Sequence, residues 1–148
     1  MILRKVNNND VDLLFSWIND PIVRDLSFTK NPIELNDHKI WFKKKYKDPN
    51  ILMWILENHC IPLGLVRLEK NGCEVNLNYL IAPDSRGQGL APKMLIKSIN
   101  QVKQYWNNIH ILAYTLPENI ASIKSLERAG FKFKSKDAEK ICYTYQIR

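Results

Sequence analysis

Glycine and cysteine are both scarce in this sequence, with five glycines and three cysteines among 148 residues. The cysteines, Cys60, Cys73 and Cys142, fall in no paired spacing, which argues against a disulfide framework and favours reduced thiols in a cytoplasmic protein. The three histidines are equally scattered, so no metal site is expected. No apolar run approaches the ~20 residues of a membrane span, and residues 1–10 lack the apolar core of a signal peptide. We therefore expect neither a secreted disulfide scaffold nor a membrane partner.

Positive charge is what the chain has in excess. Lys and Arg number 22 against 15 Asp and Glu, which gives a net charge of +7. A balance of this sign favours an anionic partner, such as a phosphorylated cofactor, an acidic substrate or nucleic acid. The densest basic cluster, residues 43–47, lies at the end of a predicted helix, where it complements the helix dipole in solvent. Charge alone therefore assigns no nucleic-acid partner.

Apolar periodicity predicts one α/β domain over residues 1–148, without repeats or a dividing linker. Helices are predicted over residues 10–19, 34–46, 90–105 and 117–129; Asp10 caps the first, Asp20-Pro21 ends it, and Gly130 closes the last. The Asn71-Gly72 pair predicts a hairpin turn. Strands are predicted over residues 2–6, 51–57, 63–69, 74–82, 109–115, 131–134 and 140–147. The element order is therefore β-α-α-β-β-β-α-β-α-β-β.

Two of the five glycines, Gly87 and Gly89, lie in the stretch DSRGQGLA at residues 84–91, between a predicted strand and a predicted helix. The first turn of a helix presents unsatisfied N–H groups, and glycines allow a phosphate to approach them closely. Arg86 adds a permanent positive charge. The stretch is no Walker loop, because no Lys-Ser/Thr follows, and no dinucleotide fingerprint, because Pro92 stands three residues past Gly89.

The pattern Arg86-x-x-Gly89-x-Ala91 resembles the pyrophosphate-binding motif of the GNAT family of N-acetyltransferases. A second stretch, PENIASIKSLERAGF at residues 117–131, resembles a later helix of that family, which an asparagine opens and Gly-Phe closes. The element order also matches along nearly the whole chain. The resemblance implies a mixed, mostly antiparallel sheet in which the fourth strand splays from the fifth. It also implies acetyl-CoA as cosubstrate and no metal.

The same resemblance implies a set of donor-binding residues. In the family, the pantetheine arm pairs with the backbone of the fourth strand, the pyrophosphate lies over the glycine loop, and an asparagine contacts the cofactor from the other side. Free backbone donors on a splayed strand also suit the oxyanion that forms when an amine attacks a thioester. The residues that match these positions are Leu80, Ile81, Ala82, Arg86, Gly87, Gln88, Gly89, Leu90, Ala91 and Asn119.

The residue that assists the leaving sulfur is open in this sequence. Many family members use a tyrosine seven residues after the helix-opening asparagine, and this chain has Leu126 there. Ser122 lies three residues after Asn119, on the same helical face, and offers a hydroxyl instead. Some relatives that acetylate ribosomal-protein termini also carry serine at this point. The alternative is that Ser122 is only a tolerated first-turn residue.

A candidate base lies on the predicted fourth strand. Glu74, Asn76 and Asn78 alternate with apolar residues and so share one face, which suggests a wet cleft rather than a packed surface. Glu74 would then accept a proton through a water held by the asparagines. The alternative is a solvated strand end, and the family's usual glutamate aligns with Val75.

The acceptor site is expected between the first two helices. Residues 16–28 and 33–45 resemble acetyltransferases that modify nucleotide-linked amino sugars in bacterial pathways to nonulosonic acids such as pseudaminic acid. Polar and aromatic residues there would suit a nucleotide diphosphate and its base, although core packing is the usual role of such aromatics. The predicted substrate-binding residues are Asn19, Arg24, His38, Trp41 and Asn78.

The predicted function is acetyl transfer from acetyl-CoA to the primary amine of a small molecule, most specifically a nucleotide-linked amino sugar. The alternatives are a protein N-terminal amine of the ribosomal-protein type, another small amine, or a non-catalytic module that binds coenzyme A. We expect a cytoplasmic monomer or homodimer.

Overall fold

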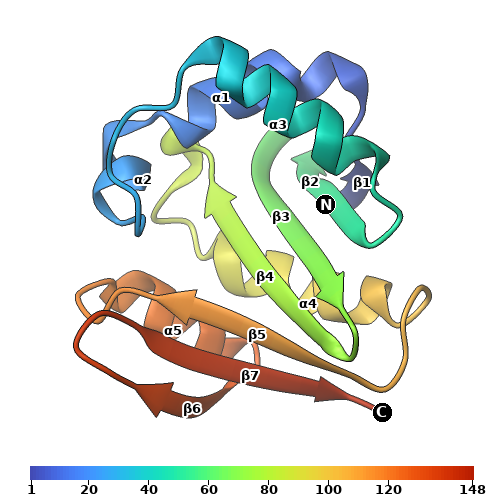
Figure 1. Cartoon of the computed structure of the whole chain (residues 1–148), viewed down its shortest axis with the longest axis vertical. Coiled ribbons are helices and arrows are strands. Elements are labelled where there is room, and N and C mark those ends of the chain that lie inside the picture. Colours follow the sequence, from blue (N-terminus) through green and yellow to red (C-terminus); the bar gives the residue numbers. More distant parts are fainter.

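Seven strands form one mixed sheet in a computed structural model that describes residues 1–148 (Figure 1). The spatial order of the strands is β1-β2-β3-β4-β5-β7-β6, and every neighbouring pair is antiparallel except β4 and β5. This is the predicted fold class. The strands are β1 (Ile2–Lys5), β2 (Ile51–Asn58), β3 (Ile61–Asn71), β4 (Glu74–Ile81), β5 (Ile109–Thr115), β6 (Lys132–Lys136) and β7 (Ile141–Ile147).

Helices cover both faces of the sheet (Figure 1). Each face is covered by a different pair of long helices, and a short helix lies at one end of the molecule. Their bounds are α1 (Val11–Ile18), α2 (Pro21–Asp25), α3 (Leu35–Lys47), α4 (Leu90–Val102) and α5 (Ile120–Arg128). The face covered by α1 and α3 and the face covered by α4 and α5 each carry a hydrophobic core. None of the helices combines the length and the apolar sequence that a membrane span requires.

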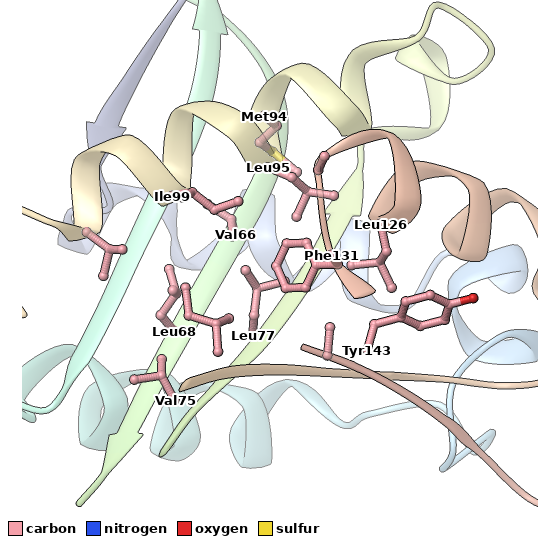
Figure 2. Packing of buried hydrophobic residues seen from close by; sticks show 14 of the residues in the cluster. Val66, Leu68, Val75, Leu77, Met94, Leu95, Ile99, Leu126, Phe131 and Tyr143 are labelled. Carbon is pink, nitrogen blue, oxygen red and sulfur yellow. The ribbon is translucent and has the colours of Figure 1, made fainter. Parts of the chain in front are cut away.

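The larger core lies between the sheet and the α4–α5 layer (Figure 2). Met94 and Leu95 of α4 and Leu126 of α5 are fully buried in it, beside Phe131. The smaller core lies on the opposite face, where Trp17 of α1 and Phe42 of α3 pack on the sheet. Because β2 has a core on each face, residues 53–57 are buried without interruption. The two cores hold the helices against the sheet, which forms part of the wall of the polar cavities.

The predicted start of the first helix is confirmed at Asp10, which is the N-cap residue of α1, but its side chain makes no capping hydrogen bond to that helix. A short 3-10 turn, Asn8–Asp10, precedes α1, and Asn7 caps this turn by accepting a hydrogen bond from the Asn9 N–H at 2.9 Å. Asp10 reaches back to accept from the Asn7 N–H at 2.8 Å, which completes a capping box around this turn. The Asp10 carboxylate also binds Arg4 at 2.8 Å, which ties the turn to β1.

A further helix, α2, was not predicted. Asp20-Pro21 does end the first helix, as expected, but it also begins the next one. Pro21 is the first residue of α2, and the Asp20 carboxylate accepts hydrogen bonds from the N–H groups of Ile22 and Val23 at 3.1 and 3.3 Å. Proline suits this position because the first turn of a helix has no partner for its N–H. Helix α2 becomes one wall of a cavity.

The fourth and fifth strands diverge. They pair in parallel only from Glu74–His110 to Asn76–Leu112, and the rest of β4 has no partner on that side. Figure 1 shows the two strands meeting at their start and separating toward their ends. The splayed pair is therefore confirmed. The Asn71-Gly72 hairpin and the Gly130 helix end are confirmed as well, with φ values of 64° and 95° at the two glycines.

Candidate active site

Two cavities meet beside the first turn of α5. The loop-side cavity has a volume of 460 Å³ and is lined by α2, the end of β4, the loop that contains Gly87 and Gly89, the start of α4, and α5. The helix-side cavity has a volume of 530 Å³ and is lined by residues 24–33, α3, the sheet and α5. Five residues line both cavities and define their junction: Leu26, Ser27, Tyr79, Asn119 and Ser122. A substrate in one cavity would therefore meet a substrate in the other at this junction.

The glycine loop opens toward the loop-side cavity. Gly87 and Gly89 have φ values of 77° and 69°, and a Cβ atom on either would meet no protein atom within 4 Å. Helix α4 begins directly after Gly89 with no side-chain cap, so the N–H groups of its first turn lack a side-chain acceptor. Both glycines and Leu90 line the cavity. This arrangement is suited to a phosphate group, which accepts from those N–H groups and is favoured by the helix dipole.

Arg86 connects this loop to helix α2. Its Nη2 donates to Oδ2 of Asp20 at 2.8 Å, and the same carboxylate caps α2. Partial burial works against the charged form of Asp20, but the hydrogen bond from Arg86 holds its pKa below the usual value. Ile22 and Val23 of α2 line the cavity opposite the loop. The Asp20–Arg86 ion pair therefore holds two parts of the cavity in place, the wall formed by α2 and the guanidinium beside the glycines.

The helix-side cavity contains a partly buried arginine that sequence reasoning did not select. Arg67 on β3 pairs in register with Asn78 on β4, and both residues line the cavity. Its guanidinium lies 4.9 Å from the ring centroid of Trp41 on α3. Its Nε lies 2.7 Å from Oε2 of Glu69, and the Nζ of Lys45 lies 2.6 Å from the other oxygen of that carboxylate. One carboxylate thus serves two cations, and the group keeps a net positive charge.

Glu69 stays ionised at neutral pH because of these neighbours. Burial works against its charge, yet Lys45 and Arg67 hold the pKa of the carboxyl below its usual value. Burial also lowers the pKa of Arg67, but a guanidinium remains protonated in proteins. The cavity therefore presents the positive charge of Arg67 to whatever binds there.

Arg24 and His38 line the same cavity. Arg24 and the Nε2 of His38 bond to backbone carbonyls, whereas the buried Nδ1 of His38 has no hydrogen-bond partner. Arg24 donates to the backbone carbonyls of Ile18 at 2.8 Å and of Thr29 at 2.9 Å. The Nε2 of His38 donates to the carbonyl of Val11 at 2.9 Å, and burial lowers the pKa of the imidazole, so the ring is neutral at pH 7. Both residues position the cavity wall.

Asn19 lies outside both cavities and connects two backbone segments. Its amide donates to the Ile33 carbonyl at 2.8 Å and accepts from the Ile33 N–H at 2.7 Å. This reciprocal pair holds the end of α1 against the loop that precedes α3.

The junction is held by the N-terminus of α5. Asn119 caps this helix, as predicted, and its Oδ1 accepts from the Ser122 N–H at 3.2 Å. The hydroxyls of Ser122 and Tyr79 are 2.8 Å apart. Burial raises the pKa of the Tyr79 phenol above its ordinary value, so the phenol is protonated at neutral pH. The point where two substrates would meet therefore carries two neutral, paired hydroxyl groups.

Comparison with known proteins gives this arrangement a family. The family model of the acetyltransferase (GNAT) domain matches residues 1–132, which is most of the chain. The chain belongs to the GNAT acetyltransferase family. Acetyl-CoA is accordingly its acetyl donor, and the domain is an N-acetyltransferase.

Solved structures share the fold of this GNAT domain. A domain from Methanocaldococcus jannaschii superposes with a TM-score of 0.84 at 25% identity, covering 99% of this chain and 97% of that one. Spermidine N-acetyltransferase from Vibrio cholerae, in complex with CoA and spermine, gives 0.83 at 18% identity, with 97% and 92% covered. An aminoglycoside acetyltransferase with coenzyme A and kanamycin gives 0.80 at 17% identity, with 99% and 94% covered.

A curated relative, an uncharacterized protein of M. jannaschii, is 23% identical over 157 residues. The alignment covers 99% of this chain but 31% of that relative, so the chain spans less than a third of its length. The similarity of residues 16–45 to nucleotide-amino-sugar acetyltransferases has no counterpart among the relatives described here, and it stays a prediction.

The loop-side cavity fits the acetyl donor of a GNAT enzyme. The glycine loop would hold the pyrophosphate on the N–H groups of α4, and the unpaired part of β4 would hold the amide groups of the arm. When bound, acetyl-CoA supplies the thioester that is broken in the reaction. The predicted donor residues that line this cavity are Leu80, Ile81, Arg86, Gly87, Gly89, Leu90, Ala91 and Asn119.

Two predicted donor residues lie outside the loop-side cavity. Ala82 is buried, and its N–H donates to the Leu63 carbonyl at 2.8 Å, which extends the β3–β4 pairing. Gln88 is exposed between the two glycines and does not line the cavity. Any role of Gln88 in binding the donor stays a prediction.

The structure brings together most of the predicted acceptor and catalytic residues. Arg24, His38, Trp41 and Asn78 line the helix-side cavity, and Ser122 lies at the junction. Glu74 is exposed at the start of β4 and lines neither cavity, so the structure does not place it beside Ser122.

Leu126, where many GNAT members have tyrosine, is 1% exposed and belongs to the larger core (Figure 2).

Sequence analysis missed Tyr79 because strand alternation assigned it to the apolar face with Val75 and Leu77. The alternation is correct for those two residues, which are buried. At Tyr79, however, β4 has already separated from β5, and the phenol hydroxyl reaches Ser122 while the residue still packs against the larger core. The only indication of this role in the sequence was the hydroxyl of Tyr79 near the end of the predicted fourth strand.

Proposed function

We propose that this domain acetylates the primary amine of a small molecule that also carries an anionic group. A nucleotide-linked amino sugar is the acceptor that best combines these features. The observation that supports the proposal is the positive charge of Arg67 in the helix-side cavity. The carboxylate of Glu69 pairs with both Arg67 and Lys45, so it neutralises the charge of Arg67 only in part.

The charge of the cavity wall argues for an anionic acceptor. Its charged lining residues are Arg24, Arg67 and Asp37, which gives a net positive charge. Spermine and kanamycin, which are bound in two of the structural relatives, each carry several amino groups, and a polycation needs acidic walls. A phosphate or carboxylate would instead accept charge-assisted hydrogen bonds from the partly exposed guanidinium of Arg67. The charge balance of this cavity therefore separates the proposed acceptor from polyamines.

Two aromatic residues of the cavity suit the base and sugar of such an acceptor. Trp41 is half-buried and already stacks on Arg67, while Phe28 is 55% exposed at the rim. An exposed aromatic ring on a cavity rim offers a face for stacking. Asn78 adds an amide on the cavity floor beside Arg67.

We propose a different anion contact from the residues that the sequence suggested. Arg24 and His38 donate to backbone carbonyls, so binding a diphosphate directly would cost those bonds. We therefore assign the contact to Arg67, and we assign Arg24 the role of holding the loop over the cavity.

An acceptor panel tests the proposal. The rate of acetyl transfer from labelled acetyl-CoA would be measured for a nucleotide-linked amino sugar, the free amino sugar, spermidine and a peptide with a free N-terminus. Charge-assisted hydrogen bonds contribute about 1.5–3 kcal/mol, so we expect kcat/KM to be about 10- to 100-fold higher for the nucleotide-linked sugar than for the free sugar. Preference for spermidine or the peptide would refute the proposal, as would equal rates for both sugars.

Two substitutions make the panel specific to the charge. Arg67→Met should raise the KM of the anionic acceptor by about tenfold or more and leave acetyl-CoA affinity unchanged, since Arg67 lines only the helix-side cavity. Arg67→Lys should lose less, because the charge is kept. Asp37→Asn should lower the KM of the anionic acceptor, because it removes a negative charge from the cavity. If the acceptor were a polyamine, the same substitution would raise its KM.

A further inference from the structure

We propose that Tyr79 and Ser122 act as a proton shuttle from the acceptor amine to the leaving sulfur. The proposal rests on the acetyltransferase activity of the domain and does not depend on the class of acceptor. Tyr79 and Ser122 would both be catalytic residues, with Tyr79 on the side of the amine.

The position of the pair carries the proposal. The two hydroxyl oxygens are 2.8 Å apart, and each residue lines both the cavity assigned to the donor and the cavity assigned to the acceptor. Tyr79 comes from β4 and Ser122 from the first turn of α5, so the pair bridges the gap left by the splayed strands. Asn119 fixes the backbone of Ser122 through its Oδ1. The thioester and the amine must meet at this bridge.

No other titratable group lines the junction. Of the five residues shared by the two cavities, only Tyr79 titrates. The Ser27 hydroxyl donates to the Val23 carbonyl, so its proton has a partner. Leu126 has no proton to give, and Glu74 lies outside both cavities. Asp37, His38 and Tyr114 line only the helix-side cavity. The Tyr79–Ser122 pair is therefore the proton path that this chain offers at the junction of the two cavities.

The shuttle balances without any further acid or base. The neutral amine forms a C–N bond to the acetyl carbon, and the C–S bond breaks. As the nitrogen loses a proton to Oη of Tyr79, Tyr79 donates its own proton to Oγ of Ser122, and Ser122 donates its own to the sulfur. Both hydroxyls end the step as they began it. Because burial keeps the phenol protonated at neutral pH, the pair is ready to donate before the amine arrives.

Three variants and a control test the shuttle. Tyr79→Phe, Ser122→Ala and the double variant would be compared with Tyr143→Phe. Tyr143 lines neither cavity, and its hydroxyl donates to Glu127 at 3.1 Å. Each single variant should lower kcat by about 10²- to 10⁴-fold, with the dissociation constant of acetyl-CoA within about twofold of wild type. The double variant should be no slower than the slower single variant, because either change breaks the same path. Tyr143→Phe should keep the wild-type kcat.

Two results would overturn the shuttle. One is a wild-type kcat for Tyr79→Phe under conditions where the chemical step limits turnover. The other is a double variant whose loss is the product of the single losses, since that would make the two hydroxyls independent. A proton inventory in mixed H₂O and D₂O separates a chemical role from a structural one. It should be curved for wild type, with more than one proton in motion, and linear for Tyr79→Phe.

A pH titration of the thiol of bound CoA, with no acceptor present, tests the shuttle independently of the acceptor panel. With CoA bound, the Ser122 hydroxyl should donate to the thiolate and lower the pH at which the thiol ionises, by about one unit relative to Ser122→Ala. The charged residues of the loop-side cavity, Arg86, Lys124 and Arg128, are present in both proteins and cancel in the comparison. Equal ionisation in the two proteins would refute contact with the sulfur even if no tested amine reacts.

Discussion

Replacing Gly89 by valine would test the glycine loop as the donor site. The φ of Gly89 is 69°, a conformation that costs a residue with a side chain about 1–2 kcal/mol. The new Cβ would meet no protein atom within 4 Å, so the side chain would extend into the space assigned to the pyrophosphate. Loss of even one charge-assisted hydrogen bond costs about 1.5–3 kcal/mol. We therefore expect acetyl-CoA affinity to fall at least about tenfold.

Gly72 provides a matched control for the backbone. Its φ is 64°, a Cβ there also meets nothing within 4 Å, and it lies in the β3–β4 turn outside both cavities. Gly72→Val should thus lose similar stability in thermal unfolding and keep wild-type affinity in titration calorimetry. Equal acetyl-CoA affinity for folded Gly89→Val and Gly72→Val would contradict this prediction.

Two further predictions concern the polar residues of the helix-side wall. Since burial lowers the pKa of His38 below its ordinary 6.5, the unfolded chain takes up the proton first, and stability should fall as pH drops below about 6.5. Urea unfolding at several pH values should show a weaker dependence for His38→Gln, and an unchanged slope would contradict this. Arg24→Ala removes bonds to the Ile18 and Thr29 carbonyls, so at about 1 kcal/mol each it should cost about 2 kcal/mol of unfolding free energy. Wild-type stability of Arg24→Ala would contradict that role.

The strands and hairpins could be predicted because their signals are local. The predicted strand over residues 109–115 is β5, and the Asn71-Gly72 turn is where the sequence indicated it. Residues 20 and 21 show the limit of a local signal. The same Asp-Pro pair that ends one helix also begins another, and the partner that stabilises its cap is Arg86, 66 residues away.

The candidate site was harder to predict, for a physical reason that Arg24 and Tyr79 illustrate. Arg24 looked like an anion ligand because a polar residue on a packed helix needs a partner, but its partners are backbone carbonyls, which the sequence does not show. Tyr79 looked like core because alternation identifies a face of the sheet and not where the sheet opens. The position of the glycine loop, in contrast, could be predicted from eight residues, because its two glycines lie between a strand and a helix. Its role in binding the donor stays a prediction.

A crystal structure of the protein with CoA would test the donor site and the position of the sulfur together. We expect the pyrophosphate on the N–H groups around Gly87 and Gly89, the arm along Leu80 and Ile81, and the sulfur within about 3.5 Å of the Ser122 hydroxyl. A pyrophosphate bound elsewhere, or a sulfur that reaches neither Ser122 nor Tyr79, would contradict this expectation.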